Sequence, residues 1–271
     1  MSVVRYGVRE QVGGVSEVDR AVEQLRLLGY AIVDGGYSAA DLARFSAAFD
    51  GVHDAVLSKY GRQALAEIDE HNTIRAPMSL DMTFIEIARN PDVLGVCQRL
   101  IGEVYYLNQQ NGIVNPARGE RYNQQAYHRD LPYQHFVSSR PLAINALFCL
   151  DAFTVNNGAT FVVPASHKQE AFPSDRIVEG SRVQIEAPAG SFIILDCMLY
   201  HSGGVNRTNM PRRAVNHVYS IPLLKQQLSL PQILGPDFAT DPAPRNFLGY
   251  DFEVPDSIER YYENRRAKYV G

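Results

Sequence analysis

The hydrophobic residues of this chain change their spacing near Val104, and that change limits the folds open to it. Beyond this point, short apolar runs alternate with clusters of Gly, Pro, Asn and Ser. The runs are 104–107, 112–115, 142–150, 159–163, 183–187, 191–196 and 214–222. Short strands separated by turn residues are typical of an antiparallel sandwich or small barrel, and they argue against alternating βαβ units. We therefore expect a mainly β core flanked by helices.

The first hundred residues show helical spacing instead. One apolar stripe begins after Ser16 and ends at Gly29, and a second begins after Ser38. Another helix is expected after Asn90, because the next residue is Pro, which suits the first helical position. The other expected elements are a short strand at 30–33 and helices near 62–69, near 82–88 and after Ser257. We predict one domain over residues 1–271, with a helical part at 1–103, a core at about 104–222 and a tail at 223–271.

Charge and composition exclude several classes of function. The chain has 26 Lys and Arg against 30 Asp and Glu, a net charge of −4, which argues against general nucleic-acid binding. No apolar run reaches the ~18 residues needed to cross a bilayer, and residues 1–6 lack the apolar segment of a secretory signal. The three cysteines, Cys97, Cys149 and Cys197, are widely separated among apolar neighbours and are interpreted as reduced thiols. We expect a cytoplasmic protein that binds a small molecule, and neither nucleic acid nor membrane; its oligomeric state is not predicted.

The strongest chemical signal is a His and a carboxylate two residues apart, His128 and Asp130. On an extended strand these side chains point to the same face. A second imidazole, for which His201 after the apolar run 191–196 is the candidate, would complete three ligands on one face of a metal. This set suits iron(II) and leaves positions for a bidentate co-substrate and dioxygen. By itself a His-x-Asp triplet is more often a surface ion pair, or a buried histidine whose ring nitrogens are hydrogen-bonded.

A guanidinium group supports the metal interpretation. Arg212 follows His201 by eleven residues and precedes the apolar run 214–222. A buried Arg that faces a metal cavity needs a carboxylate partner, which a dicarboxylate co-substrate could supply. The alternative is that Arg212 and Arg213 form an exposed pair beside Pro211. The spacings of the His and Arg residues agree with each other, and this agreement favours an Arg212 that faces the metal cavity.

These segments resemble the phytanoyl-CoA dioxygenase family of iron(II)/2-oxoglutarate oxygenases. The matching motifs are residues 128–131, residues 156–168 and residues 201–206 running on to Arg212, and the likeness covers nearly the whole chain. It implies a double-stranded β-helix (a jelly roll, cupin-like) with helices packed outside. It also implies that His128, Asp130 and His201 hold iron(II) and that Arg212 binds the distal carboxylate of 2-oxoglutarate, with O2 as the other co-substrate.

Two further side chains, Asn111 and Thr160, are candidates for contacts with 2-oxoglutarate, although polar residues on a solvated strand face would look the same. The chain departs from the family at Ala165, where members often have Gly, and at residues 115–117, where many have Lys-Pro-Pro. Because Asp130 is present, the resemblance implies oxygenation rather than halogenation. The remaining histidines near the motifs, His135, His167 and His217, are interpreted as structural.

The expected reaction is hydroxylation of a small metabolite with release of succinate and CO2. Substrate contacts are expected from residues 71–82, 118–125, 133–139 and 231–250. Arg75, Arg118 and Arg121 are candidates for an anionic group, although a solvated loop Arg is the simpler interpretation of each, and a CoA thioester is a lesser option. A non-catalytic cupin-type jelly roll that binds a metabolite or sugar is the main alternative. A zinc hydrolase with the same ligands is disfavoured because no candidate general base accompanies them.

Overall fold

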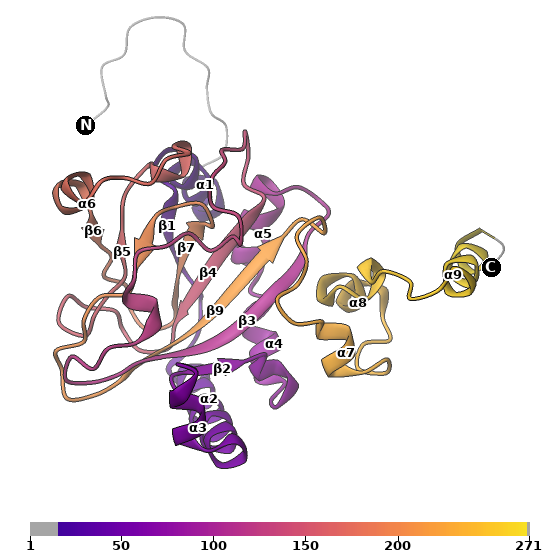
Figure 1. Cartoon of the computed structure of the whole chain (residues 1–271), viewed down its shortest axis with the longest axis horizontal. Helices are drawn as coiled ribbons and strands as arrows, with labels where there is room; N and C mark the ends of the chain where they lie inside the picture. Colours follow the sequence, from indigo (N-terminus) through magenta and orange to yellow (C-terminus); the bar gives the residue numbers. More distant parts are fainter. Residues whose placement is uncertain (1–15, 270–271) are drawn as a thin grey trace, which may run out of the picture.

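A computed structural model describes residues 16–269 of the protein (Figure 1). Residues 1–6, on which the expectation about a secretory signal rests, lie outside the described residues. The helices before the core are α1 (Glu17–Leu28), α2 (Ala39–Tyr60), α3 (Arg62–Glu67), α4 (Thr83–Ala88) and α5 (Pro91–Leu100), with the 3-10 turn η1 (Pro77–Ser79). The strands in this part are β1 (Tyr30–Asp34) and β2 (Thr73–Arg75). The predicted helices of the N-terminal part are therefore confirmed, whereas β2 was not predicted.

Local capping explains where these helices begin and end. The Ser16 side chain accepts a hydrogen bond from the Asp19 N–H, and the Asp19 carboxylate accepts one from the Ser16 N–H, so α1 begins with a capping box. Ser38 begins α2 in the same way. Gly29 ends α1 at a φ of 84°, in the left-handed region that favours glycine.

The remaining strands lie between residues 106 and 220. They are β3 (Tyr106–Asn115), β4 (Ala143–Cys149), β5 (Phe161–Val162), β6 (Val183–Gln184), β7 (Ser191–Asp196), β8 (His201–Ser202) and β9 (Arg212–Ser220). Between them lie η2 (Asn123–Gln125), η3 (Ser166–Lys168) and α6 (Asp175–Ser181). The tail holds α7 (Leu230–Leu234), α8 (Pro242–Leu248), η4 (Tyr250–Phe252) and α9 (Ile258–Tyr269). The helix expected after Ser257 is confirmed, and Figure 1 shows it standing away from the sheets.

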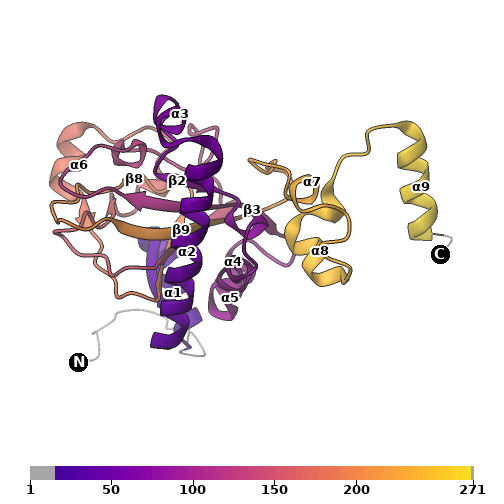
Figure 2. The ribbon, with the colours of Figure 1, turned by 90° about the horizontal axis from the view of Figure 1, so that it is seen from below.

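Two antiparallel sheets form the centre. The larger has the strand order β1-β7-β4-β9-β3-β2, and the smaller has the order β6-β5-β8. Helices α1, α2, α4 and α5 pack on one face of the larger sheet, as Figures 1 and 2 show. The other face meets the smaller sheet. The expected mainly β core with flanking helices is confirmed.

Each face of the larger sheet has its own apolar core, which explains why most residues of β4 and β7 are apolar. In β4, Ile144 and Phe148 pack against the helices, whereas Leu147 and Cys149 pack toward the smaller sheet. Successive side chains of a strand point to opposite faces, so a strand covered on both sides is a nearly continuous apolar run. The one polar residue of β4, Asn145, donates to the Asp130 carboxylate. No helix among the described residues is long and apolar enough to cross a membrane.

Candidate metal centre

A single backbone bridge brings the two candidate imidazoles together. The His128 N–H donates to the His201 carbonyl at 2.9 Å, and the His201 N–H donates to the His128 carbonyl at 3.0 Å. The two ring centroids lie 4.4 Å apart. The Asp130 N–H donates to the Cys197 carbonyl at 2.9 Å, which fixes the third side chain. The segment around His128 thus consists of this one bridge followed by a turn.

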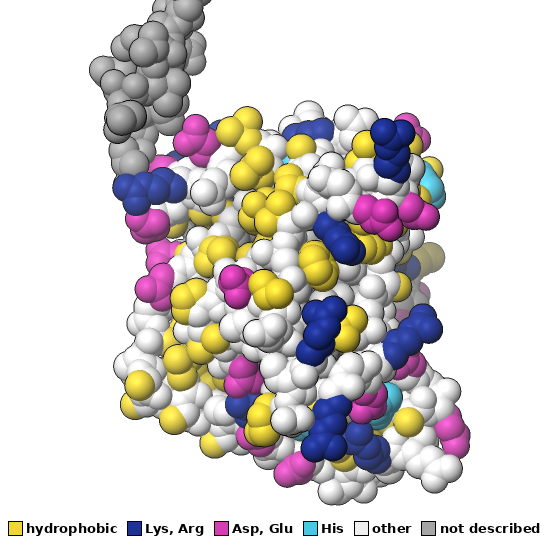
Figure 3. Space-filling model, turned by 90° about the vertical axis from the view of Figure 1, so that its left-hand side faces the viewer, with side chains coloured by type: hydrophobic (Ala, Val, Ile, Leu, Met, Phe, Trp, Pro, Cys, Tyr) yellow, Lys and Arg dark blue, Asp and Glu magenta, His cyan; other side chains and the backbone are white. Residues whose placement is uncertain are grey.

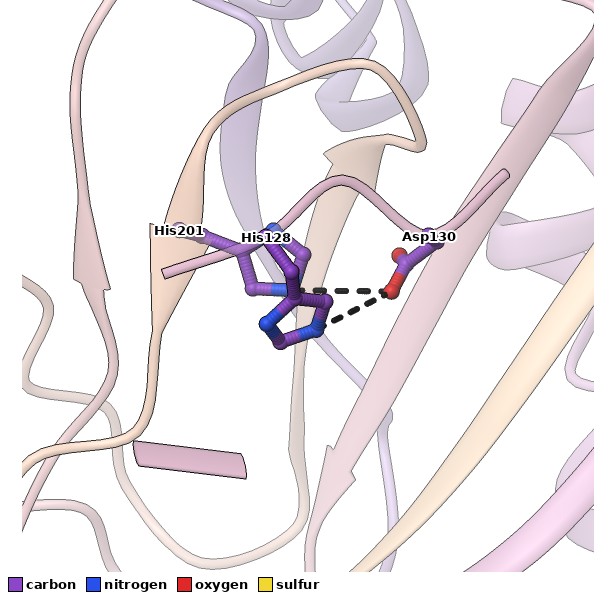
Figure 4. Close-up of side chains that lie close together, drawn as sticks. All are labelled: His128, Asp130 and His201. Carbon is purple, nitrogen blue, oxygen red and sulfur yellow. Dashed lines mark ion pairs between the residues drawn. The ribbon is translucent and has the colours of Figure 1, made fainter. Parts of the chain in front are cut away.

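The three side chains present one ligand atom each toward a common point (Figure 4). The Nε2 atoms of His128 and His201 each lie 3.6 Å from Oδ1 of Asp130. All three atoms lie within 4.8 Å of one another. Among the described residues, this is the group of His, Cys, Asp and Glu side chains with the spacing to hold a metal ion.

Hydrogen bonds behind the ligands fix their orientation. Nδ1 of His128 lies 2.8 Å from the Ala126 carbonyl oxygen, and Nδ1 of His201 lies 2.9 Å from the Leu199 carbonyl oxygen. A carbonyl can only accept, so each Nδ1 carries a proton, and in the neutral ring Nε2 has the lone pair that binds a metal. Oδ2 of Asp130 accepts a hydrogen bond from the Asn145 amide at 2.8 Å, which leaves Oδ1 for a metal.

The electrostatics of the group suit a cation. Burial raises the pKa of Asp130, but the imidazoles of His201 and His128 and the Asn145 amide outweigh it and lower that pKa to about 2. Burial lowers the pKa of His201. Burial also acts to lower the pKa of His128, but the Asp130 carboxylate outweighs it and raises that pKa. The site therefore holds an ionised carboxylate and a neutral His201, the protonation states that metal ligands need.

A two-lobed cavity surrounds the ligands. We call the first part the Arg212 lobe; its lining residues are Ile113, Tyr122, Gln124, His128, Asn145, Leu147, Thr160, Leu195, His201, Gly203, Arg212, Ala214 and Asn216. We call the second part the carboxamide lobe; its lining residues are Thr73, Arg75, Gln109, Asn111, Ile113, Gln124, His128, Arg129, Asp130, Asn216 and Gln227. His128, Ile113, Gln124 and Asn216 line both lobes, so the two lobes meet at the ligand group.

Arg212 is a buried cation without a carboxylate partner among the described residues. Its side chain is 3% exposed, one terminal nitrogen donates to the Gly158 carbonyl at 2.7 Å, and the guanidinium carbon lies 3.7 Å from the centre of the Phe153 ring. Its Nε is buried without a hydrogen bond. Burial lowers the pKa of Arg212, and the nearby Tyr122 hydroxyl opposes that effect. A guanidinium held this way fits the carboxylate of an incoming ligand.

The other two candidate residues lie in different lobes. Thr160 is 4% exposed and lines the Arg212 lobe, where its hydroxyl makes no hydrogen bond with the described residues. Asn111 lines the carboxamide lobe. Thr160 stays a predicted contact of 2-oxoglutarate because it lines the same lobe as Arg212, whereas the position of Asn111 in the other lobe fits a contact with the substrate better.

The structure leaves several expected residues outside this cavity. Arg118 and Arg121 are exposed and line neither lobe. Arg75 lines the carboxamide lobe, but its guanidinium is paired with Glu70. The expected segments 133–139 and 231–250 contribute no lining residue. The structural interpretation of His135, His167 and His217 agrees with their absence from the ligand group.

Sequence reasoning missed several residues that shape the site. Asn145 orients Asp130, and Asn216 and Gln227 help to line the carboxamide lobe. Arg129, between two ligands in the chain, is 2% exposed and donates to backbone carbonyls of residues 134, 166 and 169–171, so it ties these loops to the ligand segment. Asn115, the first residue of the segment that departs from Lys-Pro-Pro, is fully buried, and its amide donates to the Gly158 and Gly204 carbonyls.

Gly158 supports the guanidinium and tolerates no side chain. Its φ is +78°, and an added Cβ would overlap the Gly204 carbonyl oxygen and the Asn115 amide nitrogen. Gly158→Ala is expected to lower the free energy of unfolding by about 2–5 kcal/mol, from the left-handed backbone and the overpacking together. Urea denaturation measures this change. Gly180→Ala, in α6 with open space around it, is the matched control and should raise stability by less than about 1 kcal/mol; an equal loss in both variants would contradict the assignment.

Comparisons with known proteins agree with this geometry. The sequence model of the phytanoyl-CoA dioxygenase (PhyH) family matches residues 25–214. An uncharacterised protein of Mycobacterium tuberculosis is 29% identical over 254 residues, which cover 92% of each chain. An iron/alpha-ketoglutarate-dependent dioxygenase of Aspergillus calidoustus is 34% identical over 134 residues, which cover 46% of this chain and 43% of that protein.

Solved structures share the arrangement of the sheets. EctD from S. alaskensis, solved with 2-oxoglutarate and 5-hydroxyectoine, superposes with a TM-score of 0.65 at 19% identity, over 82% of each chain. The carbocyclase SnoK from nogalamycin biosynthesis superposes with a TM-score of 0.59 at 20% identity, over 78% of this chain and 88% of that one. At these identities the likeness concerns the fold alone, and it confirms the expected jelly roll with helices outside.

Proposed function

This chain belongs to the phytanoyl-CoA dioxygenase family of iron(II)/2-oxoglutarate-dependent oxygenases, and we propose that it hydroxylates a small-molecule metabolite with release of succinate and CO2. Iron(II), 2-oxoglutarate and O2 are the cofactor and co-substrates of this class. The observation that carries the proposal is the buried guanidinium of Arg212, which has no carboxylate partner among the described residues and lies in the same cavity as a His, Asp, His ligand group.

The proposed ligands of iron are His128, Asp130 and His201. Two imidazole nitrogens and one carboxylate oxygen on one face fit the donor set that non-haem iron(II) oxygenases use. When bound, the iron with its chelated 2-oxoacid supplies the oxidising power for attack on a C–H bond. The protein holds the donors in place, since the Ala126 and Leu199 carbonyls fix the rings.

The proposed anchor of 2-oxoglutarate is Arg212, with Thr160 as a second contact. The walls of this lobe include the apolar side chains of Leu147, Leu195 and Ala214, which keep water away from the guanidinium. An ion pair in such surroundings is stronger than in water. Arg212 thus sets the position of the distal carboxylate, and the other end of the co-substrate extends toward the ligand group.

Anaerobic titration with iron(II) and 2-oxoglutarate tests the chelate directly. We expect a weak visible charge-transfer band that appears only when both are present, because three protein ligands leave room for a bidentate co-substrate. Replacing His201 by Ala should remove the band, whereas replacing the exposed His135 should not. A wild-type protein that gives no band would instead support the alternative of a cupin-type binding module.

A zinc hydrolase remains disfavoured. Apart from Asp130, no Asp or Glu lines either lobe among the described residues, so the cavity lacks a carboxylate base to activate water. Substrate-stimulated succinate release separates the oxygenase from both alternatives, since neither of them consumes 2-oxoglutarate.

The proposed setting is the cytoplasm, with a small molecule as the partner. Cys97, Cys149 and Cys197 are free and buried, as reduced cysteines of cytoplasmic proteins commonly are. On the face drawn in Figure 3, Lys and Arg side chains are interspersed with Asp and Glu. Mixed charge on this face, with the net charge of −4, supports a small-molecule partner rather than nucleic acid or an anionic membrane surface.

A further inference from the structure

We propose that the carboxamide lobe selects an uncharged, ring-sized substrate that carries several hydroxyl or amide groups, an inference that rests on the oxygenase function proposed above. This lobe borders His128 and Asp130 on the side away from Arg212. A molecule in it therefore lies beside the metal ligands while the Arg212 lobe holds the co-substrate. Its volume is about 180 Å³, similar to a cavity of ~150 Å³ that holds benzene.

The sheet register places polar side chains in a row along this lobe. Arg75 on β2 pairs with Asn111 on β3, and Asn111 pairs with Asn216 on β9. Gln109 lies two residues before Asn111 on the same face of β3. The next strand, β4, presents Leu147 opposite Asn216. At this position along the strands, the face of the sheet thus changes from apolar at β4 to polar at β9, β3 and β2.

The carboxamides of this row have free hydrogen-bonding capacity. The side chains of Gln109, Asn111 and Asn216 form no hydrogen bond with other described residues, and Oδ1 of Asn216 is buried without a partner. Each carboxamide offers two N–H donors and one carbonyl acceptor. Substrate hydroxyl, amide or carbonyl groups would satisfy these donors and acceptors, whereas a hydrocarbon would leave them unpaired. Ile113 is the one apolar side chain among the described lining residues.

The charges of the lobe do not suit an anionic substrate. Nε of Arg75 donates to Glu70 at 2.9 Å, and another of its nitrogens donates to Gln227 at 3.1 Å, so this cation is already neutralised. Both terminal nitrogens of Arg129 donate to backbone carbonyls, and its Nε is buried without a hydrogen bond to the described residues. Arg75 is thus paired and the terminal nitrogens of Arg129 are occupied, which argues against the phosphates of a CoA thioester in this lobe.

A screen of three compound sets tests the inference, with substrate-stimulated succinate release as the readout. The neutral polar set holds methyl glycosides, nucleosides and cyclic amides; the anionic set holds sugar phosphates and acyl-CoA thioesters; the apolar set holds monoterpenes and fatty alcohols. We expect hits in the neutral polar set. Hits confined to either other set, or no hit in the neutral polar set by a protein that forms the chelate, overturn the inference.

Two variants then assign the selection to named residues. Asn111→Leu and Asn216→Leu preserve the approximate side-chain volume and remove the hydrogen bonds, so each should raise KM for the neutral hit by about 10-fold or more. The KM for 2-oxoglutarate should change by much less. Gln24→Leu, an exposed carboxamide on α1, is the matched control and should alter neither constant.

The outcomes distinguish a wrong substrate class from a wrong oxygenase function. A KM for 2-oxoglutarate that rises as much as the KM for the neutral hit would show that the row serves the co-substrate, and it would overturn the selection. A wild-type protein that forms no chelate band and consumes no 2-oxoglutarate refutes the oxygenase function itself. A normal chelate with hits among anionic or apolar compounds refutes only the substrate class.

Discussion

Replacing Asp130 by Ala is expected to abolish hydroxylation, with turnover falling by more than about 100-fold. Loss of a hydrogen-bond partner behind a metal ligand typically costs 10–100-fold in affinity or activity, and loss of the ligand itself costs more. Asp130 supplies the carboxylate of the group, and its Oδ1 lies 3.6 Å from both Nε2 atoms. Succinate production at saturating iron(II), together with the iron content of the purified protein, measures the loss.

Two controls separate a lost ligand from a damaged fold. Asn145→Ala removes only the hydrogen bond to Oδ2 of Asp130, so its activity should fall within the 10–100-fold range. Asp54→Ala, on the exposed face of α2, should leave activity unchanged. Undiminished turnover in the Asp130→Ala variant would refute the ligand assignment.

The parts of the fold that could be predicted are mostly those set by residues close together in the sequence. Ser16, Ser38 and Asn90 begin helices through hydrogen bonds to residues two or three positions away, so the signal lies within one turn. Strands β4 and β7 could be predicted from their apolar runs, because both of their faces are buried. In contrast, β2 and β8 are two or three residues long and exist only through pairing with distant strands, which no local pattern reveals.

The candidate site divides in the same way. His128, Asp130 and His201 could be predicted from residue type and spacing, because few residue types can bind iron. The lining of the carboxamide lobe could not, because it depends on the register that sets Asn111 opposite Asn216. Whether Arg75 meets an anion could not be predicted for a similar reason, since the sequence does not show that Glu70 is paired with it.

The departures from the family motifs have local physical explanations. Ala165 has a φ of +63°, in the left-handed region where glycine carries no steric cost, so a Gly at this position suits the backbone better. Asn115 occupies a fully buried position and bridges two glycine carbonyls near Arg212. The residue that replaces Lys there therefore stabilises the wall of the Arg212 lobe.

Replacing Arg212 by Met is expected to change affinity and stability in opposite directions. The KM for 2-oxoglutarate should rise by roughly 30-fold or more, because the distal carboxylate loses a buried charged partner. The free energy of unfolding without 2-oxoglutarate should rise by about 1–3 kcal/mol, because a buried cation without an anion is replaced by an apolar side chain of similar length. The Gly158 carbonyl stays satisfied, since it also accepts from the Asn115 amide and the Gly204 N–H.

The neighbouring Arg213 provides a control, because its replacement should change the free energy of unfolding in the opposite direction. It lies on the same strand but is paired with Asp151 and Asp50, each at 2.8 Å. Arg213→Met should therefore lower the free energy of unfolding, by about 1 kcal/mol for partly exposed pairs, and leave the KM for 2-oxoglutarate unchanged. Urea denaturation without co-substrate and steady-state kinetics measure both effects. If Arg212→Met instead lost as much stability as Arg213→Met and kept its KM, Arg212 would serve the fold, and its role toward the co-substrate would be refuted.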